Sequence, residues 1–180
     1  MNKRVVVIST SPRLGGNSDL LAEEFARGAT DAGNQVEKIT LAGKSIGFCR
    51  GCLACQNTRQ CVISDDAGSI VEKMLTADVI AFATPIYYYE MSGQMKTMLD
   101  RSNPLFTADY AFRDIYMLST AAEDGAEVPE RAVSGLQGWI NCYEQARLAG
   151  TVFGGGVNER GEIRQHPEKL REAYEMGRAV

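Results

Sequence analysis

The sequence predicts a three-layer α/β/α domain whose five-stranded parallel sheet has the doubly wound strand order 2-1-3-4-5. The first observation is a set of short, continuous apolar runs, of which residues 5–8 are β-branched at every position. Such runs suit strands that are buried on both faces. The second observation is that these runs alternate with segments of helical periodicity, which is typical of βαβ units. A length of 180 residues fits one domain, so residues 1–180 are assigned to a single domain.

The first half of the chain opens with the strand at residues 5–8, which a polar loop at residues 9–18 follows. A helix is expected next, because apolar residues recur at helical spacing until Gly33 ends the pattern. Residues 36–41 are more polar and suit a strand at the edge of the sheet. Residues 67–76 then have the pattern of a short helix.

The second half continues the alternation of strands and helices. Ser92 can cap a helix, and Pro167 suits the first position of the last helix. The expected strands are at 79–83, 115–119 and 148–153, and the expected helices at 92–101, 133–143 and 167–179. In a doubly wound sheet, ligands bind beyond the carboxyl ends of the strands where the strand order reverses, so the loops after strands 1, 3 and 4 are expected to carry the site.

Charge and hydropathy exclude several classes of partner. Lys and Arg number 19 against 23 Asp and Glu, so a net charge of -4 leaves no basic surface for nucleic acid. No apolar run approaches the roughly 18 residues of a membrane span, and the apolar run near the N-terminus is shorter than a signal-peptide core. We therefore expect a cytoplasmic protein, in which disulfides are rare.

The loop after the first strand has the chemistry of a phosphate site, although it contains neither a Walker P-loop nor a G-x-G-x-x-G motif. It combines hydroxyls with the free amides of a helix N-terminus, which favour an anion. Ser11, Asn17 and Ser18 can donate hydrogen bonds to phosphate oxygens, and Arg13 can add a planar fork. The alternative is an ordinary polar turn in which Asn17 or Ser18 caps the helix.

The loop after the third strand carries three consecutive tyrosines, Tyr87, Tyr88 and Tyr89, after the stiffening Pro85. Their rings offer flat amphipathic surface to a planar aromatic ligand, or else they are core or interface aromatics that cover the end of the sheet. If strands 1 and 3 are neighbours, the two loops are adjacent. A phosphorylated planar ligand, flavin mononucleotide (FMN), then meets the demands of both.

Together, the motifs in this order resemble the NAD(P)H-dependent FMN reductase and iron–sulfur flavoprotein group of flavodoxin-like proteins, over nearly the whole chain. The motifs are Ser11-Pro12-Arg13-x-x-Gly16-Asn17-Ser18, Thr84-Pro85-Ile86-Tyr87-Tyr88, Ser92-Gly93-Gln94-Met95-Lys96 through Asp100-Arg101, and an ending that runs from Gly161-Glu162-Ile163 to Gly177. The resemblance implies a flavodoxin-like fold with bound FMN. It places Ser9, Ser11, Arg13, Asn17 and Ser18 around the phosphate, Pro85, Ile86, Tyr87 and Tyr88 beside the isoalloxazine, and a third wall at the loop that begins with Thr120.

Four cysteines, Cys49, Cys52, Cys55 and Cys61, follow the pattern C-x2-C-x2-C-x5-C, which resembles the compact motif of the iron–sulfur flavoproteins. Closely spaced C-x2-C-x2-C lets one loop wrap three corners of a [4Fe–4S] cluster. Zinc sites more often use two well-separated C-x2-C pairs, so zinc fits less well, and free thiols are the remaining alternative. We expect Cys142 to be a small core residue.

These observations favour an FMN-dependent oxidoreductase in which NAD(P)H reduces bound FMN and a small acceptor, such as a quinone or a flavin, is reduced in turn. The flavin carries the chemistry, so no catalytic side chain is predicted. A second hypothesis is an iron–sulfur flavoprotein that passes single electrons between a ferredoxin-type protein and FMN, and a third is a ligand-binding regulator. The resemblance also implies a homodimer or homotetramer.

Overall fold

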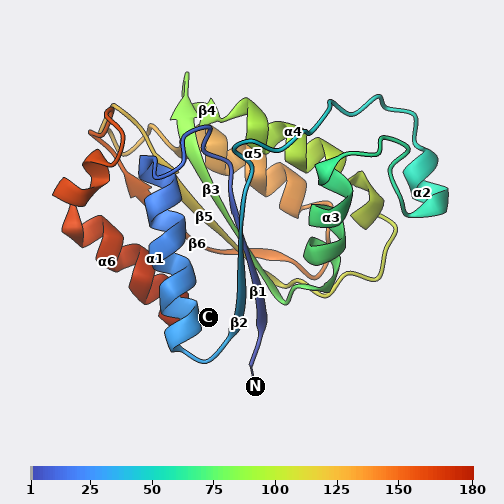
Figure 1. Cartoon of the computed structure of the whole chain (residues 1–180), viewed down its shortest axis with the longest axis horizontal. Coiled ribbons are helices and arrows are strands. Elements are labelled where there is room, and N and C mark those ends of the chain that lie inside the picture. Colours follow the sequence, from blue (N-terminus) through green and yellow to red (C-terminus); the bar gives the residue numbers. More distant parts are fainter. Residues whose placement is uncertain (1) are drawn as a thin grey trace.

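A parallel sheet with the strand order β2-β1-β3-β5-β6 forms the centre of the computed structural model, which describes residues 2–180 (Figure 1). Its strands are β1 (Arg4–Ser9), β2 (Gln35–Thr40), β3 (Val79–Tyr87), β5 (Asp114–Thr120) and β6 (Arg147–Gly154). Every pairing among these strands is parallel. Counted in chain order they have the order 2-1-3-4-5, so the predicted fold class and topology are confirmed, with the more polar β2 at an edge.

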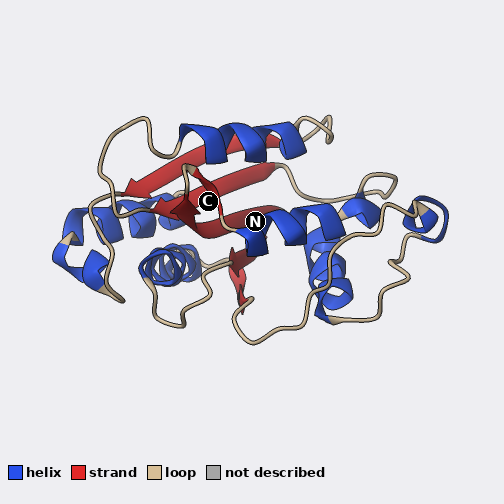
Figure 2. Ribbon diagram, turned by 90° about the horizontal axis from the view of Figure 1, so that it is seen from above, coloured by secondary structure: helices blue, strands red, loops and turns tan. Residues whose placement is uncertain are grey.

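Helices cover both faces of this sheet, and Figure 2 shows the sheet between the two helical layers. One layer holds α1 (Asn17–Asp31) and α6 (Pro167–Arg178); the other holds α3 (Asp66–Thr76), α4 (Gly93–Arg101) and α5 (Glu130–Ile140). The alternation of side chains along a strand explains the layers: Val5 and Val7 of β1 pack with α1, whereas Val6 and Ile8 pack with α3 and α4. The short elements are α2 (Ala54–Thr58), η1 (Asn103–Leu105) and η2 (Glu162–Gln165).

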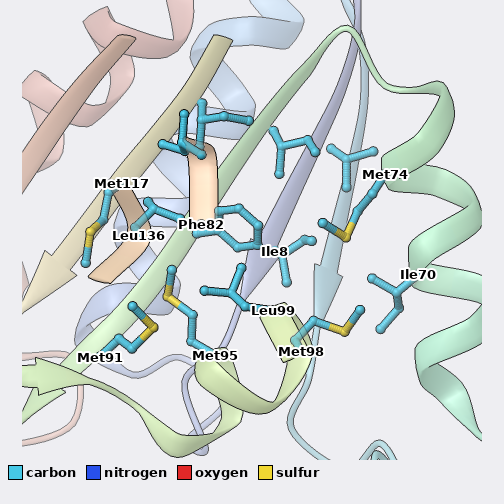
Figure 3. Packing of buried hydrophobic residues seen from close by; sticks show 14 of the residues in the cluster. Ile8, Ile70, Met74, Phe82, Met91, Met95, Met98, Leu99, Met117 and Leu136 are labelled. Carbon is cyan, nitrogen blue, oxygen red and sulfur yellow. The ribbon is translucent and has the colours of Figure 1, made fainter. Parts of the chain in front are cut away.

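Methionines fill much of the core between the sheet and the layer of α3, α4 and α5 (Figure 3). Met95 and Met98 of α4 and Met74 of α3 are fully buried around Phe82 and Ile8 of the sheet. The unbranched methionine side chain fits irregular gaps between helices and a twisted sheet. This core holds α4 against β3 and thereby places the start of α4 at the carboxyl end of the sheet.

Two features differ from the sequence prediction. The tyrosine loop is a hairpin that ends in β4 (Glu90–Met91), antiparallel to β3, with Tyr88 and Tyr89 at φ of 51° and 65°. A sequence pattern does not signal this turn, because glycine or asparagine usually takes such positions. The helix α5 ends at Ile140, so Cys142 is exposed in the following turn, and the prediction that Cys142 is a core residue was wrong.

Among the residues that the structure describes, no helix is long and apolar enough to cross a bilayer.

Candidate functional site

The loop after β1 meets the end of β3 and the segment that follows β4 at the carboxyl end of the sheet, so the two segments predicted to form the site, residues 9–18 and 84–93, are adjacent as predicted. The backbone N–H of Thr10 donates to the carbonyl of Ala83 at 2.8 Å, and the Thr10 hydroxyl lies 3.1 Å from the hydroxyl of Ser92. The amide of Ser92 in turn donates to Thr84 Oγ1 at 3.0 Å. All of these residues are fully buried, and all but Ala83 are polar. The two segments therefore form one hydrogen-bonded unit.

The N-terminus of α1 has the features of an anion site. Gly16 is the N-cap residue, and among the described residues no side chain caps the helix, so the alternative in which Asn17 or Ser18 is the cap was wrong. The hydroxyls of Ser9 and Ser18 are buried and have no hydrogen-bond partner within residues 2–180. A Cβ on Gly16 would lie 2.7 Å from Ser11 Oγ, so the loop leaves no room for a side chain at this position. Unpaired donors beside free helix amides fit a phosphate group.

Three of the predicted phosphate-binding side chains are engaged within the protein. The amide group of Asn17 accepts from the backbone N–H of Ile163 at 3.2 Å and donates to the carbonyl of Glu159 at 2.9 Å. The Ser11 hydroxyl donates to the carbonyl of Arg13 at 2.9 Å, and the Arg13 guanidinium donates to the carbonyl of Asn158 at 3.3 Å. These bonds fasten residues 158–163, between β6 and α6, onto the loop after β1.

The structure adds two charged residues that the sequence analysis missed. Asp19, 2% exposed, accepts from the backbone N–H of Gly15 at 2.8 Å and pairs with Lys38 Nζ at 2.7 Å. Burial raises the pKa of Asp19, but hydrogen bonds led by Lys38 outweigh burial and hold this pKa below its usual value. Arg160 lies over the loop, with Nη2 3.4 Å from where a Cβ on Gly15 would be. Local sequence carries no signal for Arg160, because only the tertiary fold brings it to this loop.

A groove of about 560 Å³ lies beside the candidate anion site at the N-terminus of α1. It is lined by Ile86, Tyr87, Tyr88, Tyr89, Ala121, Ala122, Glu123, Val128 and Asn158. Tyr88 is 98% exposed, so the alternative that the tyrosines are core residues of this chain was wrong. The Tyr89 hydroxyl donates to Glu123 at 2.7 Å and so bridges two walls, and this hydrogen bond raises the Tyr89 pKa.

Thr120 lies at the same end of the sheet as this groove. It is 4% exposed and is the register partner of Pro85 across β3 and β5. The residues predicted to surround a phosphate and those predicted to lie beside a planar ring are therefore neighbours at the carboxyl ends of the central strands.

The cysteines lie elsewhere, on the side of the molecule where α2 is seen beyond α3 (Figure 1). Cys49, Cys52, Cys55 and Cys61 line one hollow of about 440 Å³, and Cys142 lines it too. Cys55 is buried and its sulfur accepts a hydrogen bond from the Asn103 side chain at 3.0 Å. Within residues 2–180, no three Cys, His, Asp or Glu side chains converge as metal ligands. The thiols are thus gathered around one hollow, but the structure does not show them in a ligating arrangement.

Comparison with known proteins identifies a flavin reductase family and several related flavoproteins. The profile of the family described as NADPH-dependent FMN reductase matches residues 3–154. An iron-sulfur flavoprotein of Methanocaldococcus jannaschii is 40% identical over 102 residues, which cover 57% of this chain and 53% of that protein. An iron-sulfur flavoprotein of Methanosarcina thermophila is 26% identical over 157 residues, 86% of this chain and 81% of that protein.

The first two curated relatives are matched over only about half of their length, 53% and 46%. Among solved structures, an NAD(P)H:quinone oxidoreductase from Methanothermobacter marburgensis superposes with a TM-score of 0.76 at 17% identity. That alignment covers 99% of this chain and 96% of the other. At this identity the similarity supports the fold alone.

Proposed function

This chain belongs to the NADPH-dependent FMN reductase family, and we propose that it is an FMN-dependent oxidoreductase that takes electrons from NAD(P)H. One observation carries the proposal: an uncapped helix N-terminus with two unpaired buried hydroxyls lies beside a groove walled by aromatic rings. A phosphate and a planar ring system are the ligands that suit this pair of features.

The phosphate is proposed to bind at the start of α1. The backbone amides of its first turn and the hydroxyls of Ser9 and Ser18 would donate to the phosphate oxygens. The Ser11 hydroxyl, which donates to the carbonyl of Arg13, would shape the loop around the phosphate. Arg13 and Arg160 supply positive charge at the rim. The side chain of Asn17 is assigned a positioning role, because both ends of its amide already hold residues 158–163.

The isoalloxazine is proposed to lie against Pro85, Ile86, Tyr87, Tyr88 and Thr120. Bound FMN supplies the hydride and electron chemistry, as is general for flavin enzymes. These residues would hold the ring and shield it from water where they contact it. The groove that they line would admit a nicotinamide and then a small acceptor, a quinone or a free flavin.

Absorption spectroscopy and turnover test this proposal directly. Full-length protein titrated with FMN should show a shifted flavin absorption band and quenched flavin fluorescence, and should then oxidise NADH or NADPH in the presence of a quinone. Protein that binds no FMN would overturn the proposal. Protein that binds FMN but is not reduced by either nicotinamide would favour a ligand-binding regulator instead.

A second candidate function is single-electron transfer through an iron–sulfur cluster held by Cys49, Cys52, Cys55 and Cys61, with a ferredoxin-type protein as partner. It is supported by the four thiols around one hollow and by the similarity to two iron-sulfur flavoproteins. Thiolates are the ligands that iron–sulfur clusters use. Iron and sulfide assayed after anaerobic reconstitution test this function, and bound zinc without sulfide, or no metal at all, would contradict it.

We also propose a homodimer or homotetramer located in the cytoplasm. Tyr88 supports the assembly, because a tyrosine that is 98% exposed at the rim of a groove is available to a second copy. Light scattering of wild-type protein and of Tyr88→Ser should show a larger mass for the wild type. A monomeric wild type would contradict the assembly.

A further inference from the structure

One buried arginine links the two ends of the cysteine loop, which we define as residues 48–62. We call the flanking residues that it links, Gly47, Ile63 and Asp65, the neck of the loop. The side chain of Arg101, at the end of α4, is 0% exposed. Its Nη1 donates to the carbonyl of Gly47 at 2.8 Å and to Asp65 Oδ2 at 2.6 Å. Its Nη2 donates to the carbonyl of Ile63 at 3.2 Å and to Asp65 Oδ1 at 2.8 Å. Gly47 precedes the loop and Ile63 and Asp65 follow it, so a single guanidinium joins both of its ends.

Asp65, the carboxylate partner of Arg101, also bonds directly to backbone on both sides of the loop. Its carboxylate also accepts from the backbone N–H of Gly47 at 2.8 Å and caps α3 through Ala67 at 3.1 Å. Hydrogen bonds from Arg101 lower the pKa of Asp65 to about 2, so the pair is ionised at any physiological pH. The neck is therefore held firmly, whereas most of the loop beyond it is exposed.

The guanidinium has one donor left over. Arg101 Nε is buried and has no hydrogen-bond partner within the described part of the chain. Arg101 and Cys61 line the same hollow of about 330 Å³. An unpaired buried N–H is costly unless a partner completes it, so Nε remains an available donor beside the cysteine loop.

We propose that Arg101 is the positioning residue of the cysteine loop: it fixes the two ends of the loop and thereby sets the place of Cys61, which lies two residues before Ile63. The part of this inference that concerns a metal deepens the second function proposed above and rests on it. The part that concerns Cys61 stands on the contacts of Arg101 with Gly47, Ile63 and Asp65 and on the hollow that Arg101 and Cys61 both line.

The choice of residue supports a positioning role over a purely stabilising one. A buried ion pair is weak evidence for stability, because well-packed apolar residues of similar size often serve as well. A planar fork, however, can serve the two carbonyls and both oxygens of the carboxylate at once, and lysine lacks this geometry. Arg101→Lys therefore keeps the charge and removes the geometry.

The test compares Arg101→Lys and Asp65→Asn with two controls in the full-length protein loaded with FMN. Arg147→Lys alters a more exposed arginine paired with Asp114, and Phe25→Leu perturbs the core on the opposite face of the sheet. Alkylation by iodoacetamide, followed at each cysteine by mass spectrometry, is the first readout. Losing a hydrogen bond to a charged group costs about 1.5 kcal/mol or more, which is about tenfold in an equilibrium. We therefore expect Cys61 to react about tenfold faster, relative to the exposed Cys142, in both neck variants and in neither control.

Iron binding after anaerobic reconstitution is the second readout. Loss of a residue that orients a ligand typically weakens metal affinity by about 10–100-fold, and we expect this range for Arg101→Lys. An unchanged ratio of Cys61 to Cys142 reactivity, or an equal change in Phe25→Leu, would overturn the inference. If Arg101→Lys does not fold, Asp65→Asn gives the same alkylation ratio.

The two proposals fail separately. Wild-type protein that binds no iron would end the second function, while the alkylation ratio would still decide the role of Arg101. Iron bound equally by wild type and Arg101→Lys, with an unchanged alkylation ratio, would end the role of Arg101 and leave the second function standing.

Discussion

Replacing Gly16 with alanine would place a methyl group inside the loop that is proposed to hold the phosphate. The new Cβ would lie 2.7 Å from Ser11 Oγ and 2.9 Å from the carbonyl oxygen of Arg13. Both distances are shorter than van der Waals contact, and one of the two atoms belongs to the backbone. The loop must therefore widen, which moves the amides at the start of α1 away from Ser11.

The size of the effect follows from the cost of overpacking. Adding a methyl group to a closely packed site costs about 1–3 kcal/mol, and alanine is also a poorer N-cap than glycine. With tenfold in affinity for each 1.4 kcal/mol, the dissociation constant of FMN should rise about 5- to 150-fold. Gly16 has φ of -70°, so alanine is not disfavoured by its backbone angle, and the close contacts and the poorer N-cap are the causes of the effect.

Fluorescence titration with FMN measures this change. The matched control is Gly138→Ala, because a Cβ on Gly138, in α5, meets nothing within 4 Å. Alanine should stabilise α5 by roughly 0.5–1 kcal/mol and leave FMN affinity unchanged. A Gly16→Ala protein that binds FMN within twofold of wild type would refute the placement of the phosphate at this helix terminus.

Three further predictions concern acid stability and the groove. Because Arg101 lowers the pKa of Asp65 from 3.8 to about 2, this carboxylate contributes about 2.5 kcal/mol of stability that is fully present above pH ~4 and is lost as the pH falls toward ~2. Acid unfolding monitored by circular dichroism should show this loss in wild type and not in Asp65→Asn. Tyr89→Phe removes the hydrogen bond to Glu123 across the groove, so FMN dissociation in stopped flow should quicken by about 2- to 12-fold with little change in melting temperature; an unchanged rate would contradict a bridging role. Arg160→Ala should weaken FMN binding about fivefold at low ionic strength and less at high salt, and an effect independent of salt would rule out a charge contribution.

The periodicity of the sequence was sufficient for the fold because buried parallel strands and amphipathic helices each leave a local pattern. The run at residues 5–8 predicted β1, and the sheet order followed from the alternation of strands and helices. Ser92 and Pro167 are found at the cap and first position expected of them, because capping depends on local chemistry.

Local patterns were insufficient where distant segments compete for the same atoms. Asn17 has the composition of a phosphate ligand, yet its amide is taken up by residues 158–163, which no local pattern connects to it. The tyrosine hairpin needed two residues at positive φ, which their residue type does not indicate. The helical spacing of residues 133–143 likewise does not show that α5 ends at Ile140 and leaves Cys142 exposed.

The sequence by itself therefore determined which segments form strands and helices, and that hydroxyls, tyrosines and cysteines follow particular strands. Tertiary structure alone decided which polar atoms remain unpaired at the start of α1, and that Arg101 joins the two ends of the cysteine loop. The physical reason is that secondary structure is encoded in neighbouring residues, whereas the pairing of a buried donor depends on every segment that packs against it.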